Sequence, residues 1–256
     1  MEKDVKKALD DIDSVNPFAT YLSDSTLSRV GGWIDTGSYV LNAIVSGSIH
    51  GGIPKGRVTM LAGESMTGKS LFVMKILAAA QKEGLVPVIF DTENAIDPEG
   101  AERLGLDVSN VKYVPCISIE QTRNALYKFL TSVKEKGLEG KFIIAIDSLG
   151  NLQSELSLAR MGKDSTSTDM GTNARAMKSL MQTCTNLGAV TQTTILCTNH
   201  VYDNPAALFP SIEKNMPGGK SCVYLPSVTI QLARKPVKSD GGKTMDGETA
   251  VAQKNY

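Results

Sequence analysis

Short apolar runs alternate with helical periods along most of the chain from residue 57 onwards. Five runs have the length and β-branched composition of strands buried on both faces of a parallel sheet: RVTMLA, LVPVIFD, KFIIAID, TTILCTN and SVTIQLA. Between them, apolar residues recur three or four positions apart, as in residues 119–133 and 177–187. The alternation predicts an α/β fold with a mostly parallel central sheet and helices on both of its faces.

The last part of the chain has a different pattern. The segment SDGGKTMDGE favours a turn, and TAVAQKN after it is typical of a strand that returns antiparallel to SVTIQLA.

The first 30 residues have the pattern of an arm. One helix of about three turns carries an apolar stripe that it is too short to bury alone. The stripe consists of Val5, Ala8, Leu9 and Ile12. The linker SVNPFATYLSDST follows it. We expect an N-terminal arm over residues 1–30, which docks on its own domain or on a neighbouring copy, and a core domain over residues 31–256.

Composition narrows the class of protein. The chain has 256 residues, a net charge of zero and an apolar share typical of a globular protein. It has no apolar run of about 18 residues, and its N-terminus is charged, so we expect a soluble, cytoplasmic protein with no membrane segment. The four cysteines have no paired spacing and are interpreted as reduced core thiols.

The octapeptide GESMTGKS matches the phosphate-binding loop pattern, and it lies between a predicted strand and an apolar helix. Its glycines let backbone N–H groups converge on phosphate oxygens, Lys69 reaches the β and γ phosphates, and the Ser70 hydroxyl binds Mg²⁺. The predicted nucleotide-binding residues here are Gly63, Glu64, Ser65, Met66, Thr67, Gly68, Lys69 and Ser70.

Three further polar residues follow predicted strands, where ligands of open α/β sheets collect. Asp147 ends KFIIAID and is the candidate second ligand of Mg²⁺; the alternative is a helix cap. Glu93, just beyond LVPVIFD, is the candidate catalytic base, with Asp91 close by. His200 follows TTILCTN and is a candidate sensor of the γ phosphate.

A second Gly-Lys-Ser occurs in NMPGGKS, but it fails the phosphate-loop pattern. Lys214 stands where Gly63 stands in the first copy, and the following CVYLPSVTI is strand-like. We interpret this copy as the far hinge of a mobile loop that begins at His200.

The order of these motifs resembles the RecA recombinases over roughly residues 20–256. The resemblance is carried by the first phosphate loop and its preceding segment, and then by VIFDTENAIDPEGAERLGLD, FIIAIDSLGNL, DMGTNARAMKSL and TILCTNHVYDN. The forms IDSLGNL and TNHVY, with RAMKSL between them, are most similar to the strand-exchange recombinases of T4-type bacteriophages.

The resemblance implies a RecA-like ATPase core that uses ATP and Mg²⁺. Such a protein is a DNA-dependent ATPase that forms a helical filament on single-stranded DNA and pairs it with homologous duplex DNA in recombination and repair. The N-terminal helix would dock on the adjacent protomer, and ATP would lie between subunits. A single-strand-binding protein and a loading mediator are implied as partners, and the host cytoplasm as the location if a phage encodes the chain.

The resemblance also implies roles for single residues. Lys69, Ser70 and Asp147 would bind nucleotide and Mg²⁺. Glu93 would activate water, and His200 would sense the γ phosphate. Asp97 would contact the adenine base. Lys254 would contact the γ phosphate across the subunit interface.

Two DNA-binding loops are implied, with basic and small residues that contact the backbone independently of sequence. The first lies around SELSLARMGKDSTSTDMG and the helix after it, with Arg160, Lys163, Arg175 and Lys178. The second spans residues 201–220, with Lys214, Gly218, Gly219 and Lys220.

The chain departs from the family pattern at three points. Gly100 stands where the family usually has an aromatic residue that stacks on adenine, which leaves base selectivity open. Tyr256 stands where a second basic residue is usual. The family's C-terminal region does not follow it, as in a compact variant or a fragment.

The alternatives to a recombinase are a ring-shaped motor of the replicative helicase type, a RecA-like regulatory ATPase, and a nucleotide-binding structural protein.

Overall fold

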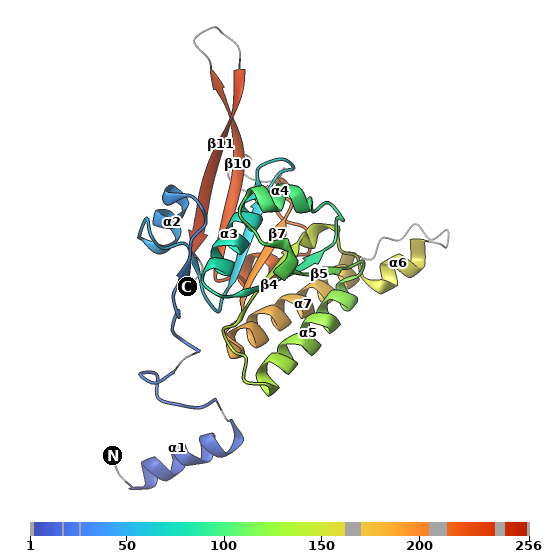
Figure 1. Ribbon diagram of the computed structural model, residues 1–256. Coiled ribbons are helices and arrows are strands. Elements are labelled where there is room, and N and C mark those ends of the chain that lie inside the picture. Colours follow the sequence, from blue (N-terminus) through green and yellow to red (C-terminus); the bar gives the residue numbers. More distant parts are fainter. Residues whose placement is uncertain are drawn as a thin grey trace.

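A seven-stranded sheet lies at the centre of the core (Figure 1). The computed structural model describes residues 3–16, 18–25, 27–161, 170–204, 214–238 and 244–254. The strands of the central sheet are β3 (Val58–Gly63), β4 (Val86–Asp91), β5 (Lys112–Pro115), β6 (Phe142–Asp147), β7 (Thr194–Asn199), β10 (Val228–Lys238) and β11 (Thr244–Lys254). Their order is β11-β10-β3-β7-β6-β4-β5, and every neighbouring pair is parallel except β10 and β11. The predicted α/β fold is therefore confirmed.

Both faces of the sheet are covered by helices. One face packs against α2 (Tyr39–Ser46), α3 (Lys69–Lys82) and α4 (Pro98–Arg103), and the other against α5 (Ile119–Glu135), α7 (Met170–Val190) and α8 (Ser221–Tyr224). In β6, Ile143 and Ala145 belong to the first apolar cluster, whereas Ile144 and Ile146 belong to the second. Strands buried on both sides in this way read as continuous apolar runs, which is why the sequence predicts them well.

Smaller elements connect this framework. They are β1 (Trp33–Ile34), β2 (Ile53–Pro54), η1 (Val108–Asn110), η2 (Leu149–Asn151), α6 (Glu155–Met161), β8 (Tyr202–Asp203) and β9 (Lys214–Asn215). The pair β8 and β9 is antiparallel and brings the two ends of the second predicted DNA loop together. Residues 205–213 of that loop lie outside the described residues.

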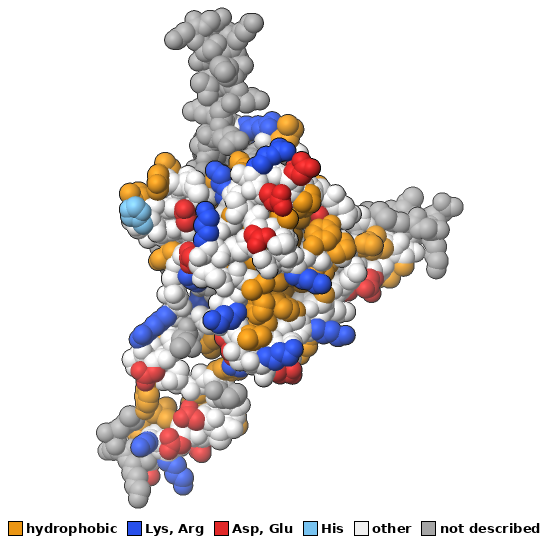
Figure 2. Space-filling model, viewed as in Figure 1, with side chains coloured by type: hydrophobic (Ala, Val, Ile, Leu, Met, Phe, Trp, Pro, Cys, Tyr) orange, Lys and Arg blue, Asp and Glu red, His pale blue; other side chains and the backbone are white. Residues whose placement is uncertain are grey.

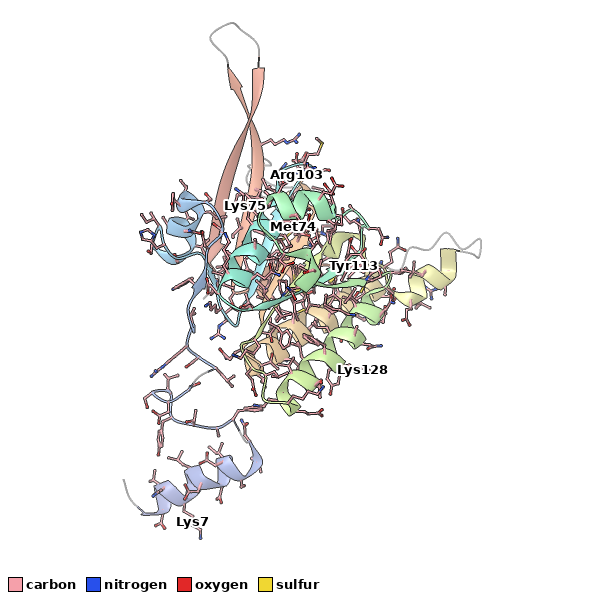
Figure 3. The ribbon with its side chains drawn as sticks, in the orientation of Figure 1. Lys7, Met74, Lys75, Arg103, Tyr113 and Lys128 are labelled. Carbon is pink, nitrogen blue, oxygen red and sulfur yellow. The ribbon has the colours of Figure 1, made fainter. Side chains whose placement is uncertain are left out.

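The predicted N-terminal helix is present as α1 (Lys3–Val15), which extends away from the core and carries the labelled Lys7 (Figures 1 and 3). Its apolar stripe is exposed: Val5 is 46%, Leu9 38% and Ile12 52% exposed. The linker after it touches the core where the Phe18 ring lies 5.7 Å from the Lys134 ammonium. The stripe therefore has no cover within the described part of this chain.

Two expectations for local structure need correction. The segment after Lys220 was expected to be strand-like, but it forms the short helix α8, in which the Tyr224 N–H donates to the Lys220 carbonyl at 3.1 Å. This turn buries Cys222 in the core beneath α7, and the strand starts at Val228. The predicted turn SDGGKTMDGE is also shorter than expected, because β10 extends to Lys238 and β11 starts at Thr244.

The cysteines agree with their prediction, because all four are free and buried. Burial raises the pKa of Cys222 to about 12. Among the helices of the described ranges, none combines the length and apolar character needed to cross a lipid bilayer.

The packing of α5 on the sheet generates a stability prediction. Leu130 is fully buried in the second apolar cluster, so Leu130→Ala leaves a cavity and is expected to lower the free energy of unfolding by about 2–5 kcal/mol. Tyr127→Ala, on the exposed side of the same helix, is the matched control, with an expected loss below about 1 kcal/mol. Chemical denaturation measures both, and equal losses would contradict this packing.

Candidate nucleotide-binding site

The phosphate loop lies between β3 and α3, as the sequence predicts. Gly68 has a φ of 88°, in the left-handed region that favours glycine, and α3 begins at the next residue. Close packing requires glycine at position 63 as well, because a Cβ there would lie 2.5 Å from Thr67 Oγ1 and 2.8 Å from the Leu232 carbonyl oxygen. The two glycines thus permit the tight loop that directs the N-terminus of α3 toward the site.

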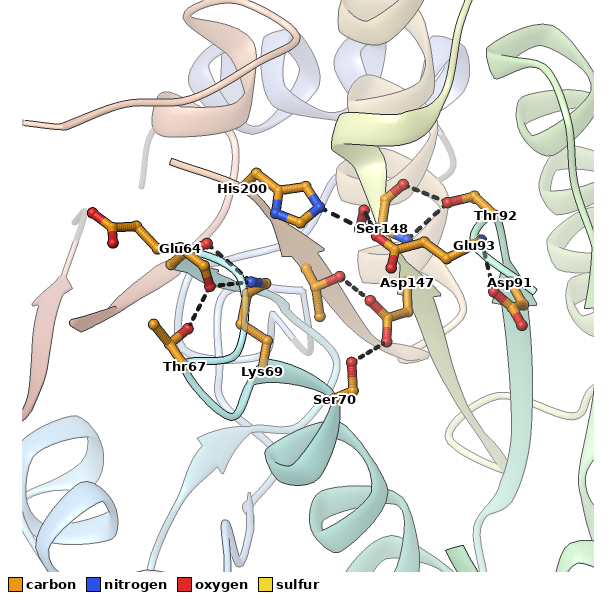
Figure 4. Close-up of polar contacts among 12 residues, drawn as sticks. Glu64, Thr67, Lys69, Ser70, Asp91, Thr92, Glu93, Asp147, Ser148 and His200 are labelled. Carbon is orange, nitrogen blue, oxygen red and sulfur yellow. Dashed lines mark hydrogen bonds and ion pairs between the residues drawn. The ribbon is translucent and has the colours of Figure 1, made fainter. Parts of the chain in front are cut away.

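Lys69 is the buried cation of the loop. Its Nζ donates to the carbonyls of Gly63 at 2.9 Å and of Glu64 at 2.8 Å (Figure 4). Burial lowers the pKa of Lys69, while the negative charges of Asp147 and Glu93 act in the opposite direction. The ammonium is therefore held by neutral carbonyl oxygens, which an anionic phosphate can replace.

Asp147 connects three elements at the bottom of the site. Its carboxylate accepts hydrogen bonds from Ser70 of α3, at 2.9 Å, and from Thr198 of β7 (Figure 4). Burial raises the pKa of Asp147, and these two hydrogen bonds act against that rise. The peptide bond from Asp147 to Ser148 is cis.

The oxygen atoms at Asp147 and Ser70 are suitable ligands for a magnesium ion. Ser70 Oγ and the Asp147 carboxylate converge, and Mg²⁺ prefers such oxygen ligands, with phosphates and water completing its shell. Among the described residues, no group of three or more His, Cys, Asp or Glu side chains is arranged to hold a metal ion. Two protein oxygens leave the other positions of a Mg²⁺ shell to phosphate oxygens and water.

The two acids after β4 have different environments. Asp91 is 1% exposed, and its carboxylate accepts from the N–H groups of Glu93 and Asn94 at 2.9 Å and from the Tyr113 hydroxyl at 3.1 Å. Glu93 accepts instead from Ser148 Oγ, at 2.6 Å, and borders the cavity. Asp91 therefore shapes the turn and lines one of the two cavities described below, whereas Glu93 lines both.

His200 lies beside Glu93, with 3.2 Å between His200 Nε2 and Glu93 Oε1 (Figure 4). The residue before it, Asn199, is fully buried and donates from Nδ2 to the Pro217 carbonyl at 3.1 Å. Sequence reasoning assigned no role to Asn199, which joins the end of β7 to the far end of the second predicted DNA loop.

Two neighbouring cavities, each of about 210 Å³, form the ligand space. The first is bordered by Lys69 and His200 and by four residues that it shares with the second: Ser70, Leu71, Glu93 and Asp147. The second is also lined by apolar side chains and by Asp91, Asp97 and Gly100. The labelled Met74 of α3 lies on its wall (Figure 3). The sequence thus predicts residues of two adjoining cavities, one more polar and one more apolar.

Asp97 occupies a structural position within that space. Its Oδ1 accepts from the Glu99 N–H at 3.1 Å and caps α4. A Cβ at Gly100 would lie 2.6 Å from Asp97 Oδ2, so the capping carboxylate favours glycine there.

A contact that sequence reasoning missed lies at the tip of the phosphate loop. Arg234 of β10 donates from Nη2 at 2.6 Å and from Nε at 3.2 Å to the Met66 carbonyl. Met66 has a φ of 62°, a backbone conformation that the arginine contact stabilises. The two residues are 168 positions apart, and no local motif marks the contact.

The predicted DNA-binding residues are divided between two regions. Arg160 lies on α6, and Arg175 and Lys178 are exposed on α7, whereas Lys163 lies outside the described residues. In the second loop, Gly218 and Gly219 have φ values of 87° and 81°, and Lys220 is exposed. On the face shown in Figure 2, Lys and Arg side chains are dispersed among acidic ones.

Lys214 differs from these residues. Its Nζ pairs with Glu64 Oε1 of the phosphate loop at 3.2 Å and with Asp203 Oδ1 of β8. The hydrogen bonds to Asp203 and Glu64 raise the pKa of Lys214. The structure therefore places this predicted DNA contact against the phosphate loop.

Lys254 lies at the other end of the sheet from the phosphate loop of its own chain. It pairs with Val228, which pairs in turn with Thr59, four residues before Gly63 along β3. Four residues of strand span about 13 Å. The backbone of Lys254 therefore lies more than about 13 Å from the phosphate loop of its own chain.

The chain was compared with known proteins. It matches the family model described as the RecA N-terminal domain over residues 3–254. It is 31% identical to Protein RecA of Chlorobium chlorochromatii over 222 residues, which cover 85% of this chain and 58% of that protein. It is 28% identical to Protein RecA of Rubrobacter xylanophilus over 258 residues, 98% of this chain and 71% of that protein. Against Protein RecA of Aquifex aeolicus the identity is 28%, with 82% of this chain and 57% of that protein covered.

The buried carboxylate of Asp147 generates a pH prediction. Because its pKa is raised in the folded chain, the folded state binds this proton to a higher pH than the unfolded state does. The contribution of Asp147 to the free energy of unfolding therefore falls as the pH rises from the ordinary carboxyl pKa through the raised pKa of the folded state. We expect nucleotide-free Asp147→Asn to melt above the wild type at pH 7, with the difference shrinking toward acidic pH.

Thermal unfolding followed by circular dichroism across pH checks this expectation. Asp10→Asn, on the exposed surface of α1, is the control and should change the melting temperature little. A less stable Asp147→Asn at pH 7 would contradict the claim that burial outweighs the hydrogen bonds of the carboxylate.

Proposed function

The chain belongs to the RecA family, and from that membership we propose that it is an ATP-dependent DNA recombinase. It spans 58% of the first relative above, so the activity of a whole RecA protein is part of this proposal. The observation that carries it is the convergence of Lys69, Ser70, Glu93 and Asp147 on one cavity of nucleotide-binding type.

The residues of the cavity suit ATP hydrolysis. The N–H groups of the loop and Lys69 would bind the β and γ phosphates, and Ser70 and Asp147 would hold Mg²⁺, which neutralises phosphate charge. Glu93 would orient the attacking water and accept its proton, with Ser148 and His200 holding its carboxylate in place. Since His200 touches Glu93 directly, it can respond to the state of the γ phosphate.

The apolar cavity beside the phosphate loop suits the adenine base. Ile96, Met74 and Leu104 line it, and Asp97 lies at its polar edge. Glycine at position 100 leaves the base without a stacking aromatic ring at that point, so apolar side chains would provide the contact.

The proposed DNA partner is single-stranded DNA in a helical filament, paired with homologous duplex during recombination and repair. Arg175, Lys178 and Lys220 are exposed basic residues that fit backbone contacts. The motifs IDSLGNL and TNHVY support membership in the T4-type bacteriophage group, which would place the protein in the host cytoplasm. A single-strand-binding protein and a loading mediator complete the proposal.

The filament also accounts for the N-terminal arm. The exposed stripe of α1 needs an apolar partner, and an adjacent protomer would provide one. We propose residues 1–30 as the docking arm and residues 31–256 as the ATPase and DNA-binding core. Filament assembly would also bring Lys254 of one protomer to the phosphate loop of the next, because its backbone lies at the other end of the sheet from the loop of its own chain.

The proposed activity predicts ATP hydrolysis that rises with single-stranded DNA, on samples in which electron microscopy resolves helical filaments. Lys69→Ala should lower turnover by about 100-fold or more, because the loop loses its phosphate-binding cation. Lys82→Ala, in the last turn of the same helix, is the matched control and should keep turnover within about twofold. Closed rings on the same DNA would favour a motor, and unchanged turnover in Lys69→Ala would remove the site.

The docking arm predicts a separate result. Deleting residues 1–16 should leave a folded monomer, because α1 contributes no cover to the core of its own chain. Sedimentation and microscopy with ATP and single-stranded DNA measure assembly, and circular dichroism verifies folding. Filaments that persist at wild-type concentration would refute the docking role.

A further inference from the structure

The phosphate loop carries a carboxylate of its own. Glu64 directly follows Gly63, and its side chain points away from Asp147, on the opposite side of the loop (Figure 4). Lys214 Nζ lies 3.2 Å from Glu64 Oε1 and also contacts Asp203. The Lys214 side chain is 12% exposed, whereas those of Glu64 and Asp203 are 56% and 73% exposed.

A carboxylate at this position conflicts with the chemistry of the loop. The loop attracts anionic phosphates through N–H groups, a helix N-terminus and Lys69. Glu64 adds a negative charge within the same short segment, and charges this close are only partly screened in physiological salt, where the screening length is about 8 Å. An uncompensated Glu64 would therefore weaken the binding of a triphosphate.

We propose that Lys214 is a positioning residue of the nucleotide site, which neutralises Glu64 so that the loop can accept a triphosphate. The inference rests on the nucleotide binding that is part of the proposed function. It assigns Lys214 to the nucleotide and not to DNA.

Nucleotide binding and the contact of Lys214 with Glu64 should strengthen each other. A bound triphosphate adds negative charge near the Lys214–Glu64 pair and so stabilises the ammonium in its place. By linkage, nucleotide then strengthens the attachment of β9 to the phosphate loop, and an attached β9 strengthens nucleotide binding by the same factor. The far end of the 201–220 segment is thus fixed beside the loop when nucleotide is bound.

The surroundings of Lys214 oppose a role in DNA binding. Its side chain is mostly covered, and moving it to a DNA phosphate would leave Glu64 uncompensated. Lys178 and Lys220, in contrast, are exposed. The two carboxylate partners raise the pKa of Lys214, so the side chain stays protonated at neutral pH and its charge offsets that of Glu64.

The experiment is a double-mutant cycle on the full chain, with a fluorescent non-hydrolysable ATP analogue and Mg²⁺ in the absence of DNA. Lys214→Met should weaken binding of the analogue by about threefold to tenfold, a factor suited to one lost charge pair. Lys214→Arg keeps the charge and should bind within about twofold of the wild type. In a Glu64→Gln background, Lys214→Met should change affinity by less than about twofold, because the charge that it neutralised is absent.

Asp203→Asn is the matched control. It removes the other carboxylate partner of Lys214 but leaves Glu64 neutralised, so affinity for the analogue should not fall. An equal loss for Lys214→Met with and without Glu64 would overturn the inference, and so would no loss at all. A wild-type chain that does not bind the analogue would overturn the proposed function together with the inference.

A DNA arm separates the two roles of Lys214. At saturating analogue, the salt dependence of single-stranded DNA binding should be the same for Lys214→Met and the wild type. If Lys214 contacts a DNA phosphate, the slope of log K against log salt should decrease by about 0.7. That decrease, with unchanged analogue affinity, would overturn the inference.

Discussion

The buried carboxylate of Asp147 is the group on which the arrangement of the site depends. It is 7% exposed and lies among β6, β7 and the first turn of α3, where Thr198 and Ser70 donate to its two oxygens. A carboxylate in this position is unfavourable for the folded chain unless hydrogen bonds and a cation compensate it. The parallel sheet makes this convergence possible, because β3, β7, β6 and β4 are neighbours and end at the same edge.

The end of β7 connects this carboxylate to the rest of the molecule. Thr198 donates a hydrogen bond to Asp147, and Asn199 donates one to the Pro217 carbonyl. His200 forms a hydrogen bond with Glu93. Side chains alternate along a strand, so Asn199 faces the side opposite to its neighbours. Three consecutive residues therefore join the candidate magnesium ligand, the far end of the 201–220 segment and the candidate base.

Sequence reasoning predicted the elements whose signals are local. The phosphate loop and the buried strands are continuous patterns of a few residues, and Glu93, Asp147 and His200 follow from the rule that ligands collect at strand ends. The edge strand β5 was missed because it is mostly exposed and lacks an apolar run, and α8 because four residues are too few for a helical period. The contacts of Lys214 and Arg234 with the loop were missed because each joins residues at least 150 positions apart.

The contacts at the end of β7 link the candidate nucleotide site to the base of the second predicted DNA loop. Hydrogen–deuterium exchange of the full chain, with and without a non-hydrolysable ATP analogue and Mg²⁺, tests this link most directly. If this link transmits nucleotide binding, exchange should become slower in the phosphate loop, at residues 199–203 and also at residues 214–219, in the absence of DNA. Slower exchange confined to residues 63–70 would contradict it.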